Sequence, residues 1–339
     1  MKNNLIKTVI LLLAVTFVTL QSCEKTNLKV VESDMLIFED IDAFNSELEK
    51  VLSFTSEELK SYEESKGYKS FGRSCDKIYE SIDFESFKSY KELETYINSM
   101  SAYLQIVEEE NELFVETKLD NNPFRYFMNK DKIFAIGSAV YKGIENYTIS
   151  TDIEHIEVIK KIDETNYKLY MQDNRLLFSP IKVQTISDNY NKDTQHICGA
   201  NGGKYAVDRT DDGRDRTKIE HEITLMYGFS SYIGNYTNVY GRALTRPYKR
   251  TLGIWYYCSR TISCNYKIAV GIKDLNNIWS REFYNYSKTL YGSKIEYVFL
   301  NRNYLGHLQT DFIHFDGYDS WADTPSTNPA VLQCNTSLF

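Results

Sequence analysis

The hydrophobic period of the chain changes near residue 112, and this change limits the folds that the chain can adopt. Before it, apolar residues recur at steps of three and four, as at Ile41, Phe44 and Leu48, which is typical of amphipathic helices. After it, apolar residues such as Leu113 and Val115 alternate with polar ones, which indicates half-buried strands. We therefore expect an α+β fold, with an N-terminal helical region followed by a β-rich, antiparallel, sandwich-like region.

Capping residues place the expected helices of the first region. Thr55 with Glu58 and Ser89 with Glu92 match the capping box, in which two side chains satisfy backbone N–H groups of the first turn. Gly67 stands where a residue with a left-handed backbone would end the second helix. We predict helices at residues 41–53, 56–66 and 90–106.

Charge is unevenly distributed along the chain of 339 residues, a length that allows two domains. Residues 24–120 hold 24 acidic and 11 basic side chains, whereas residues 121–339 hold 23 and 26. Asn121-Asn122-Pro123 is a turn signal at the same place. We therefore predict an acidic helical domain at 34–120 and a β-rich domain at 121–339. The acidic half argues against nucleic acid as a partner.

Short alternating or apolar runs predict the strands of the β-rich region. They cover residues 132–140, 145–151, 153–160, 167–171, 176–183, 219–227, 251–259, 266–272, 294–300 and 311–315. In the middle of this series, residues 188–218 lack periodicity and are rich in Asn, Asp and Gly. A stretch of that length without regular structure is unusual in a compact domain, so we predict a long polar loop there.

Residues 1–22 have the layout of a bacterial export signal. Two lysines supply positive charge, residues 8–20 form an uncharged and mostly apolar run, and the small residue Ser22 precedes Cys23. The apolar run is shorter than the ~20 residues of a comfortable membrane span. The alternative is a buried N-terminal helix with an incidental cysteine, but the order of these features favours a cleaved signal peptide.

The four residues Leu20-Gln21-Ser22-Cys23 resemble a bacterial lipobox. The resemblance implies acyl chains on Cys23, and each buried methylene adds about 0.8 kcal/mol to membrane binding. Residues 23–33 are polar and indicate a flexible tether. The expected partner is therefore a lipid bilayer, reached through acylated Cys23. The expected location is the bacterial cell envelope, at the outer membrane, and the sequence fits either face of that membrane.

Five further cysteines lie in the part that is expected outside the cytoplasm, where disulfides can form. Cys258 and Cys264 would bond if residues 259–263 formed a hairpin tip that set them opposite each other. If both instead lie on one continuous strand, they share a face but stand too far apart to bond. The spacing Cys-x-x-Cys is absent from the sequence, so zinc and thioredoxin-like chemistry have no support.

A set of short segments carries a family resemblance. The set consists of Phe38 with the helix to Val51, Thr55-Ser56-Glu57-Glu58, Gly67-Tyr68-Lys69-Ser70, Met128-Asn129-Lys130 and Ile136-Gly137-Ser138-Ala139-Val140-Tyr141-Lys142. It resembles an uncharacterised family of Bacteroidota envelope lipoproteins with a domain of unknown function. The resemblance implies an anchored envelope protein with a strand pair near the last segment, and it carries no catalytic residues. One feature departs from the family pattern. The family usually has an aromatic residue in the helix before the Gly-Tyr turn, and the one aromatic residue that could match it in this sequence is Tyr62.

Residues 208–215 contain the best candidate for a metal site. Asp208 and Asp212, with the glycine that follows, match the first half of a calcium-binding loop. The twelfth position is Ile219, which cannot bind a cation, and the interleaved arginines would repel one. The favoured interpretation is a loop of internal ion pairs, with calcium at the two aspartates as the alternative. No cofactor is expected.

Signatures of catalysis are scarce. His221-Glu222 lacks the second histidine of a zinc-protease helix and stands in an expected strand. The sequence contains no Gly-x-Ser-x-Gly elbow and no phosphate-binding glycine loop followed by Lys-Ser or Lys-Thr. A small basic cluster indicates a solvated turn, with a site for an acidic ligand as the alternative. The cluster consists of Arg242, Arg246, Lys249 and Arg250.

Aromatic residues suggest where a ligand would bind. Residues 200–339 hold 15 tyrosines and all 3 tryptophans of the chain. Flat rings with polar tips suit sugar faces and protein interfaces, although core packing explains most of them. Residues 317–323 are polar and rich in turn formers, so we predict that Tyr318 and Trp321 are exposed and bind the ligand.

These patterns favour a non-catalytic envelope module that binds a glycan or a protein, and they predict a broad exposed aromatic patch. A hydrolase acting on glycan or peptide is one alternative. It requires a cleft with two convergent carboxylates, or a nucleophile beside a histidine. A structural envelope subunit is the other alternative, and it would show neither cleft nor patch.

Overall fold

The computed structural model describes most of the chain after residue 28. The described ranges are 29–31, 35–109, 111–120, 122–180, 182–183, 207–209, 215–230, 234–273, 278–306, 313–325 and 329–334. Cys23 and the expected signal peptide lie outside these ranges, as does most of the loop expected at 188–218. None of the described helices is both long and apolar enough to cross a membrane.

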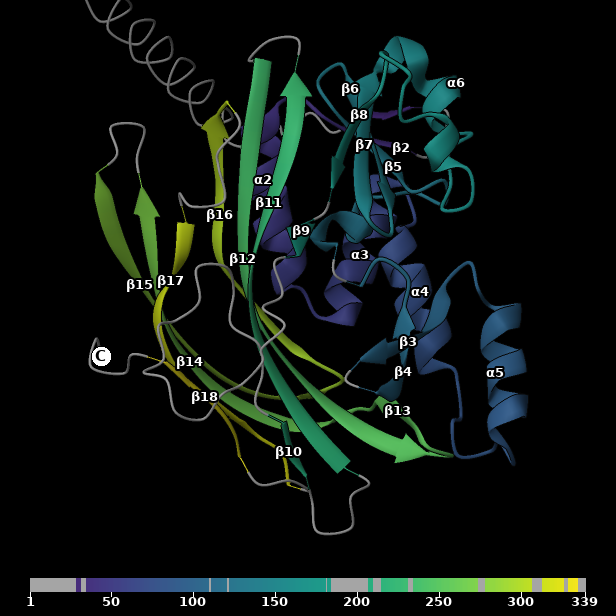
Figure 1. Cartoon of the computed structure of the whole chain (residues 1–339), viewed down its shortest axis with the longest axis vertical. Helices are drawn as coiled ribbons and strands as arrows, with labels where there is room; N and C mark the ends of the chain where they lie inside the picture. The colour runs from purple at the N-terminus through teal and green to yellow at the C-terminus, as the bar shows by residue number, and fades with distance from the viewer. Residues whose placement is uncertain are drawn as a thin grey trace, which may run out of the picture.

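Within these described ranges, three β-sheets form the body of the protein (Figure 1). The first sheet runs β1 (Lys29–Val31), β2 (Met35–Phe38), β5 (Ile133–Ile136), β6 (Ala139–Ile144), β7 (Tyr147–Asp152) and β8 (Leu177–Pro180). The second runs β10 (Val207–Arg209), β11 (Asp215–Ser230), β12 (Gly234–Thr251), β13 (Ile254–Tyr257), β4 (Glu112–Thr117) and β3 (Leu104–Glu109), with β16 (Ile295–Leu305) beside β12 and β9 (Lys182–Val183) beside β11. The third runs β15 (Trp279–Gly292), β14 (Arg260–Lys273), β17 (Ile313–Asp323) and β18 (Ala330–Cys334).

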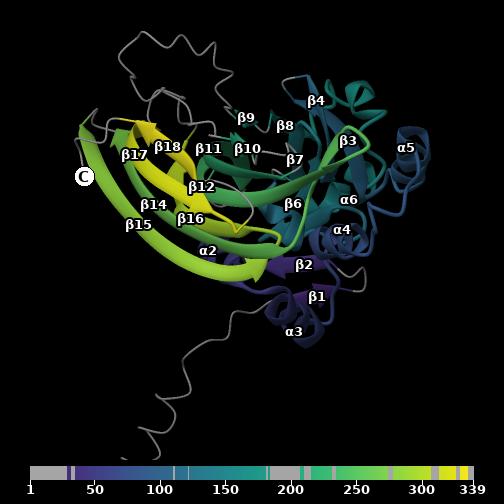
Figure 2. The ribbon, with the colours of Figure 1, turned by 90° about the horizontal axis from the view of Figure 1, so that it is seen from below.

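The second and third sheets pack face to face around a shared core. Ile219 of β11, Ile268 of β14 and Phe299 of β16 belong to one cluster of buried apolar side chains. Alternation along each strand supplies these side chains, because every second residue of a strand points to the same face. Figure 2 shows the long strands of both sheets curving together. Their pairing is antiparallel except between β13 and β4.

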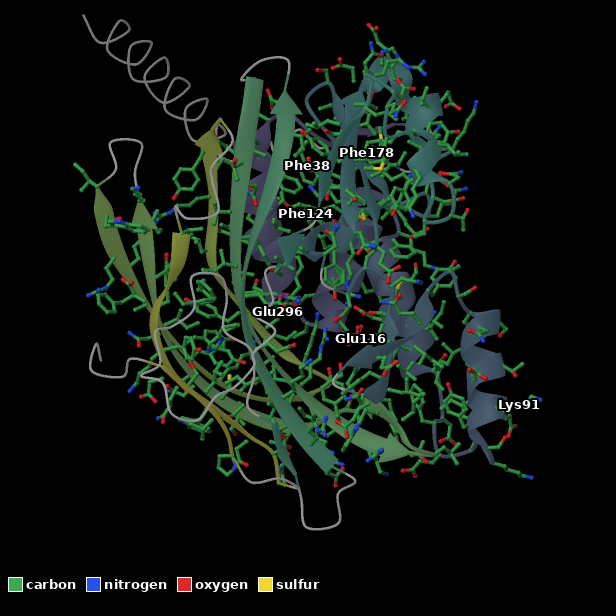
Figure 3. All side chains as sticks on the ribbon, in the orientation of Figure 1. Phe38, Lys91, Glu116, Phe124, Phe178 and Glu296 are labelled. Atoms are coloured by element: carbon green, nitrogen blue, oxygen red, sulfur yellow. The ribbon has the colours of Figure 1, made fainter. Side chains whose placement is uncertain are left out.

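Short helices lie against the sheets. The α-helices are α2 (Ile41–Ser53), α3 (Ser56–Lys66), α4 (Phe71–Glu80), α5 (Tyr90–Ser99) and α6 (Ile156–Ile159). The 3-10 helices are η1 (Pro123–Tyr126), η2 (Ile153–His155) and η3 (Tyr167–Leu169). Phe44 of α2 packs on Phe124 of η1 and Phe134 of β5, with ring centroids 5.1 and 5.4 Å apart. Phe38 and Phe124 lie in this same core (Figure 3).

Local capping signals are confirmed for the first helices. Both predicted spans, 41–53 and 56–66, match α2 and α3 residue for residue. Thr55 and Glu58 form the expected capping box, and Gly67 ends α3 in the left-handed region with φ 70°. α5 stops at Ser99, short of the predicted end at 106, because β3 begins only five residues later.

The expectation of an N-terminal acidic helical region followed by a separate β-rich region is wrong, although the β-rich character is confirmed. β2 precedes the helices in the chain and pairs in parallel with β5, at Ile37 and Ala135 among others. β4 follows the helices and pairs in parallel with β13, more than a hundred residues away. The helices are short and use these sheets to cover their apolar faces. Hydrogen bonds of the first and second sheets therefore cross the boundary that the charge pattern indicates at residue 121.

Two predicted strands are helical instead. Residues 153–160 form η2 and α6, and residues 167–171 contain η3. Ile153, Ile156 and Ile159 recur every three residues, a spacing that fits one side of a helical turn better than a strand. Ile159 is the member of this set that is fully buried.

Candidate functional site

β17 carries both predicted ligand-binding residues and places them on opposite faces of the third sheet. Residues three apart on a strand point in opposite directions. Tyr318 is buried between the sheets, where its ring meets His221 edge-on with centroids 5.6 Å apart. Trp321 is 41% exposed on the outer face. Residues 317–323 are thus part of a strand and not the expected turn-rich tail, and the two residues do not form a joint site.

The outer face of the third sheet carries further exposed aromatic side chains. On β15, Trp279 is 47%, Phe283 51% and Tyr291 75% exposed. Their spacings of four and eight residues keep them on one face, with Trp279 and Phe283 about 13 Å apart along the strand. Val331 of β18 lies beside Trp321 and is also exposed. We call Trp279, Phe283, Trp321 and Val331 the aromatic face, whereas Tyr291, near the end of β15, lines a pocket described below. The even spacing on β15 was the sequence signal that could have located it.

The polar side chains between these rings are mostly uncharged. Asn265, Asn285, Ser287 and Thr289 share the outer face by strand register. Two pairs of charged residues on this face bind each other, and Lys273 Nζ lies 5.9 Å from the centre of the Trp279 ring. Lys267 Nζ lies 3.4 Å from Asp319 Oδ2, and Arg281 Nε donates to Asp316 Oδ2 at 2.5 Å. The face therefore offers separate apolar rings with neutral donors and acceptors between them.

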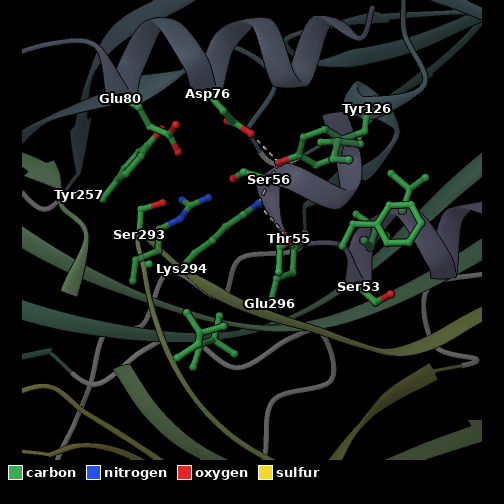
Figure 4. Close-up of a pocket in the computed structure, with 18 of the residues that line it drawn as sticks. Ser53, Thr55, Ser56, Asp76, Glu80, Tyr126, Tyr257, Ser293, Lys294 and Glu296 are labelled. Carbon is green, nitrogen blue, oxygen red and sulfur yellow. Dashed lines mark hydrogen bonds and ion pairs between the residues drawn. The ribbon is translucent and has the colours of Figure 1, made fainter. Parts of the chain in front are cut away.

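A second candidate site is a pocket of about 240 Å³ between the helices, the second sheet and the turn from β15 to β16 (Figure 4). We call it the charged pocket. Its lining includes the α2–α3 corner, residues of α4 and η1, and the small residues Gly292 and Ser293. The charged residues of the lining are Asp76, Glu80, Asp120, Arg125, Arg246, Lys288, Lys294 and Glu296.

Asp120 joins two buried arginines that line the charged pocket. Its Oδ1 lies 3.2 Å from Arg125 Nη1, and its Oδ2 forms an ion pair with Arg246. Burial opposes ionisation, but Arg246 and Arg125 overcome it and hold the pKa of the Asp120 carboxyl well below its ordinary range. Arg125 Nη2 also donates to Asp76 Oδ1 at 2.8 Å. These groups are fixed before any ligand arrives.

Lys294 and Tyr126 extend the same network towards β16. Lys294 Nζ donates to the Tyr126 hydroxyl at 3.0 Å and to Glu296 Oε2 at 2.9 Å. The Tyr126 hydroxyl donates in turn to Asp76 Oδ2 at 2.8 Å. Burial favours the neutral acid at Glu296, yet the nearby cations Lys294 and Arg242 lower the pKa of that carboxyl to about 2. Glu296 is therefore ionised at neutral pH.

Two nearby carboxyls behave in the opposite way. Burial, aided by the charge of Asp76, raises the pKa of Glu80, which lines the charged pocket from α4. Burial and the adjacent Asp120 raise the pKa of Glu116 on β4 to about 7. Glu116 is partly buried, and Figure 3 shows Lys91 on the outer side of α5. A protonated carboxyl can donate as well as accept a hydrogen bond.

The predicted basic cluster divides between interior and surface. Arg242 and Arg246 are buried within β12, where Arg242 Nε donates to Glu222 Oε2 at 2.6 Å. Lys249 lies nearer the surface and forms an ion pair with Glu85, which lies between α4 and α5. The expectation of a solvated turn is therefore wrong, because the cluster is part of a strand of 18 residues.

His221 and Ser320 lie at hydrogen-bonding distance inside the core. His221 Nε2 is 2.9 Å from Ser320 Oγ, and both residues are fully buried between the second and third sheets. Burial lowers the pKa of His221 to about 3, so the ring is neutral at physiological pH. A catalytic serine must reach its substrate, and this one is enclosed by side chains that include Tyr266 and Tyr318. We assign the pair a structural role.

Cys258 and Cys264 do not form the predicted disulfide, since both are free thiols. Cys258 follows the end of β13, and Cys264 lies inside β14, where its backbone neighbours are Lys288 and Ala322. β14 already begins at Arg260, so residues 259–263 do not make a hairpin tip. The two cysteines consequently never face each other.

The predicted metal and lipid sites lie at or beyond the limits of the described ranges. Asp208 lies in β10, where its backbone pairs with Thr217, whereas Asp212 lies outside those ranges. Among the residues that the structure describes, no group of three or more His, Cys, Asp or Glu side chains could hold a metal ion. Lipidation of Cys23 stays a prediction.

Comparisons with known proteins add little to this geometry. No family model matches the chain, and no curated protein matches it. Among solved structures, the chain is similar to a DUF4848 family protein from Bacteroides thetaiotaomicron, with 12% sequence identity and a TM-score of 0.30. The match covers 91% of this chain and 100% of the other. At this TM-score the similarity carries no argument about function, so the functional argument rests on the two sites.

Proposed function

We propose that this protein is a lipid-anchored, non-catalytic module of the bacterial cell envelope that binds a neutral glycan on its aromatic face. The anchor is the acyl group expected on Cys23, and the export signal with its lipobox supports it. The observation that carries the binding role is the set of exposed rings on one face of the third sheet. A sugar ring has apolar C–H faces that pack on aromatic rings and hydroxyl groups that bond to neighbouring amides.

The chemistry of the aromatic face favours a glycan over a protein partner. Protein interfaces centre on a contiguous apolar patch that a polar rim surrounds. Here Trp279 and Phe283 stand about 13 Å apart along β15, and a polar pair, Arg281 with Asp316, lies between them. A chain of repeating units can meet separate rings in turn. Because four of the charged side chains on this face form two internal ion pairs, an uncharged chain fits it best.

Binding to a panel of neutral polysaccharides and their oligosaccharides tests the proposal. We expect Trp321→Ala and Phe283→Ala each to weaken binding of the best ligand about tenfold, in line with the ~1.5 kcal/mol upper range for a ring contact. Leu169→Ala removes an exposed apolar side chain outside the third sheet and should leave binding unchanged. Isothermal titration calorimetry measures the affinities. Unchanged affinity in both aromatic variants, or release of new reducing ends from the ligand, would refute the proposal.

The anchor is tested separately in cells. Cys23→Ala should abolish acylation, because it removes the thiol that is expected to carry the acyl chains. Incorporation of labelled palmitate into the wild type, and none into the variant, would support the assignment. A variant that still incorporates palmitate, or a wild type that incorporates none, would contradict it.

A further inference from the structure

We infer that the charged pocket is a second binding site, separate from the aromatic face, and that it takes one uncharged sugar unit. The pocket is a built site, because three of its charged lining residues, Asp120, Arg125 and Arg246, are more than nine-tenths buried. They come from the turn after β4, from η1 and from β12, so the fold itself brings them together.

The charge of the lining argues for a neutral ligand. Four carboxylates, Asp76, Glu80, Asp120 and Glu296, face four cations, Arg125, Arg246, Lys288 and Lys294. Most of these charges are already matched by ion pairs within the protein. A ligand with a net charge of either sign would leave one of these groups facing a like charge at short range, which low-dielectric surroundings make costly.

The pocket nevertheless keeps donors and acceptors for hydroxyl groups. The Arg246 guanidinium has five N–H donors, and among the described residues its ion-pair partner is Asp120. Lys294 has three donors, of which Tyr126 and Glu296 take two. Glu80 also lines the pocket, and among the described residues it forms no ion pair. A polyhydroxyl ring can satisfy such a mixed set, because each hydroxyl both donates and accepts.

The size of the charged pocket and an aromatic ring at its rim restrict the ligand further. The pocket volume of about 240 Å³ lies below the ~300–1,000 Å³ typical of pockets for drug-sized ligands, so it fits a ligand as small as one sugar ring. Tyr291, the most exposed aromatic of the third sheet, stands at the pocket rim and offers its ring for packing. Figure 4 shows Glu80, Tyr257, Ser293 and Lys294 around the same space. Gly292 and Ser293 are small, so the entrance stays open.

A titration of the mature full-length chain with neutral monosaccharides tests this inference. The panel contains glucose, galactose, mannose and N-acetylglucosamine, and it adds glucuronate and glucosamine as anionic and cationic probes. We expect at least one neutral sugar to bind with saturation and both charged probes to bind at least tenfold more weakly than their neutral parent. Protein-observed NMR detects binding even where it is weak.

Variants locate the binding. Ser293→Trp fills the entrance and should weaken binding at least tenfold, whereas Ser101→Trp, at an exposed turn after α5, should not change it. If Ser293→Trp fails to fold, Glu80→Gln and Tyr291→Ala replace it, since both change exposed parts of the lining. No saturable binding of any neutral sugar, preference for a charged probe, or full binding in all three pocket variants would overturn the inference.

The same variants distinguish this site from the aromatic face. Trp321→Ala with Phe283→Ala should retain monosaccharide binding in the charged pocket while losing the polysaccharide. Glu80→Gln should do the reverse. If either variant lost both monosaccharide and polysaccharide binding while its melting temperature stayed unchanged, the two sites would be one. That result would overturn the inference as stated.

Discussion

Arg125 is buried and binds two carboxylates at once. Its Nη2 donates to Asp76 at 2.8 Å, and its Nη1 lies 3.2 Å from Asp120. Such a network contributes little net stability relative to an apolar core, because its charges must first lose their water. Removing one member is different, since the charges left behind have lost their compensation.

We therefore expect Arg125→Ala to lower the free energy of unfolding by about 3–5 kcal/mol. Urea unfolding followed by circular dichroism measures the change. Arg175→Ala is the matched control, because Arg175 pairs with Asp173 at the surface, where water screens the charges. Its unfolding midpoint should stay where it is. Equal losses in the two variants would show that the buried network does not act as described.

Glu116 gives the stability of the protein a specific pH dependence. Its pKa is about 7 when folded, against 4.5 as the ordinary value, so the folded state binds the proton more tightly than the unfolded state. The stability linked to this proton is complete below pH 4.5 and is lost as the pH rises through 7. His221 works in the other direction, because its lowered pKa removes stability as the pH falls below 6.5.

Glu116→Gln isolates the first of these effects. The glutamine keeps the shape and stays neutral, so the variant should gain about 2 kcal/mol relative to wild type between pH 5 and pH 8. Unfolding curves recorded for both proteins at each pH give the difference, from which the common contribution of His221 cancels. A difference that is constant with pH would contradict the raised pKa.

At the scale of single elements, the sequence predicts structure where the signals are local. α3 is such a case, because its N-cap, its first turn and its final glycine all lie within a dozen residues. α4 escaped prediction although Phe71, Cys75 and Tyr79 recur every four residues and Ser70 caps the first turn. Its mean polarity and its glycine, Gly72, obscured that period.

The capping box of α3 allows a direct test. Thr55→Ala removes the side-chain acceptor for Glu58 N–H, and we expect a loss of about 1 kcal/mol in the free energy of unfolding. Thr95→Ala in the middle of α5 is the control, because the Thr95 hydroxyl bonds back to Lys91 O and caps nothing. Chemical denaturation should show the control at least as stable as wild type, because alanine favours a helix interior more than threonine does. A similar loss of stability in both variants would mean that the effect comes from removing any threonine side chain and not from the cap.

At the scale of the whole molecule, the pairings that shape the protein have no local signal. β4 and β13 meet at Val115 and Tyr256, and β2 and β5 meet at Phe38 and Ile136, across a long stretch of chain in each case. The charged pocket is assembled from equally distant segments. Periodicity indicates that strands exist but not which strands are neighbours. The even spacing of the β15 rings could place them on one face of a strand, but it could not show which face the rest of the molecule leaves exposed.

The segment of residues 35–120, which contains α2 to α5, should not fold without the strands that follow it. Its interior depends on partners outside it: Phe44 stacks on Phe134, Phe71 N donates to Met128 O at 2.7 Å, and the Tyr79 hydroxyl accepts from Tyr257 N at 2.8 Å. A fragment of residues 35–120 would leave these apolar faces in water. Short helices are marginal when they have no packing partner.

We expect the fragment of residues 35–120 to show little helical signal by circular dichroism and no cooperative melting, whereas the mature full-length chain melts in a single transition. Helix formation in the fragment would appear only when a fragment of residues 122–334 is added, because the second piece supplies β5, η1 and β13. A fragment that melts cooperatively on its own would restore the boundary at residue 121 that the charge pattern indicates. It would also mean that the parallel pairs of β2 with β5 and β4 with β13 join two finished units instead of completing one core.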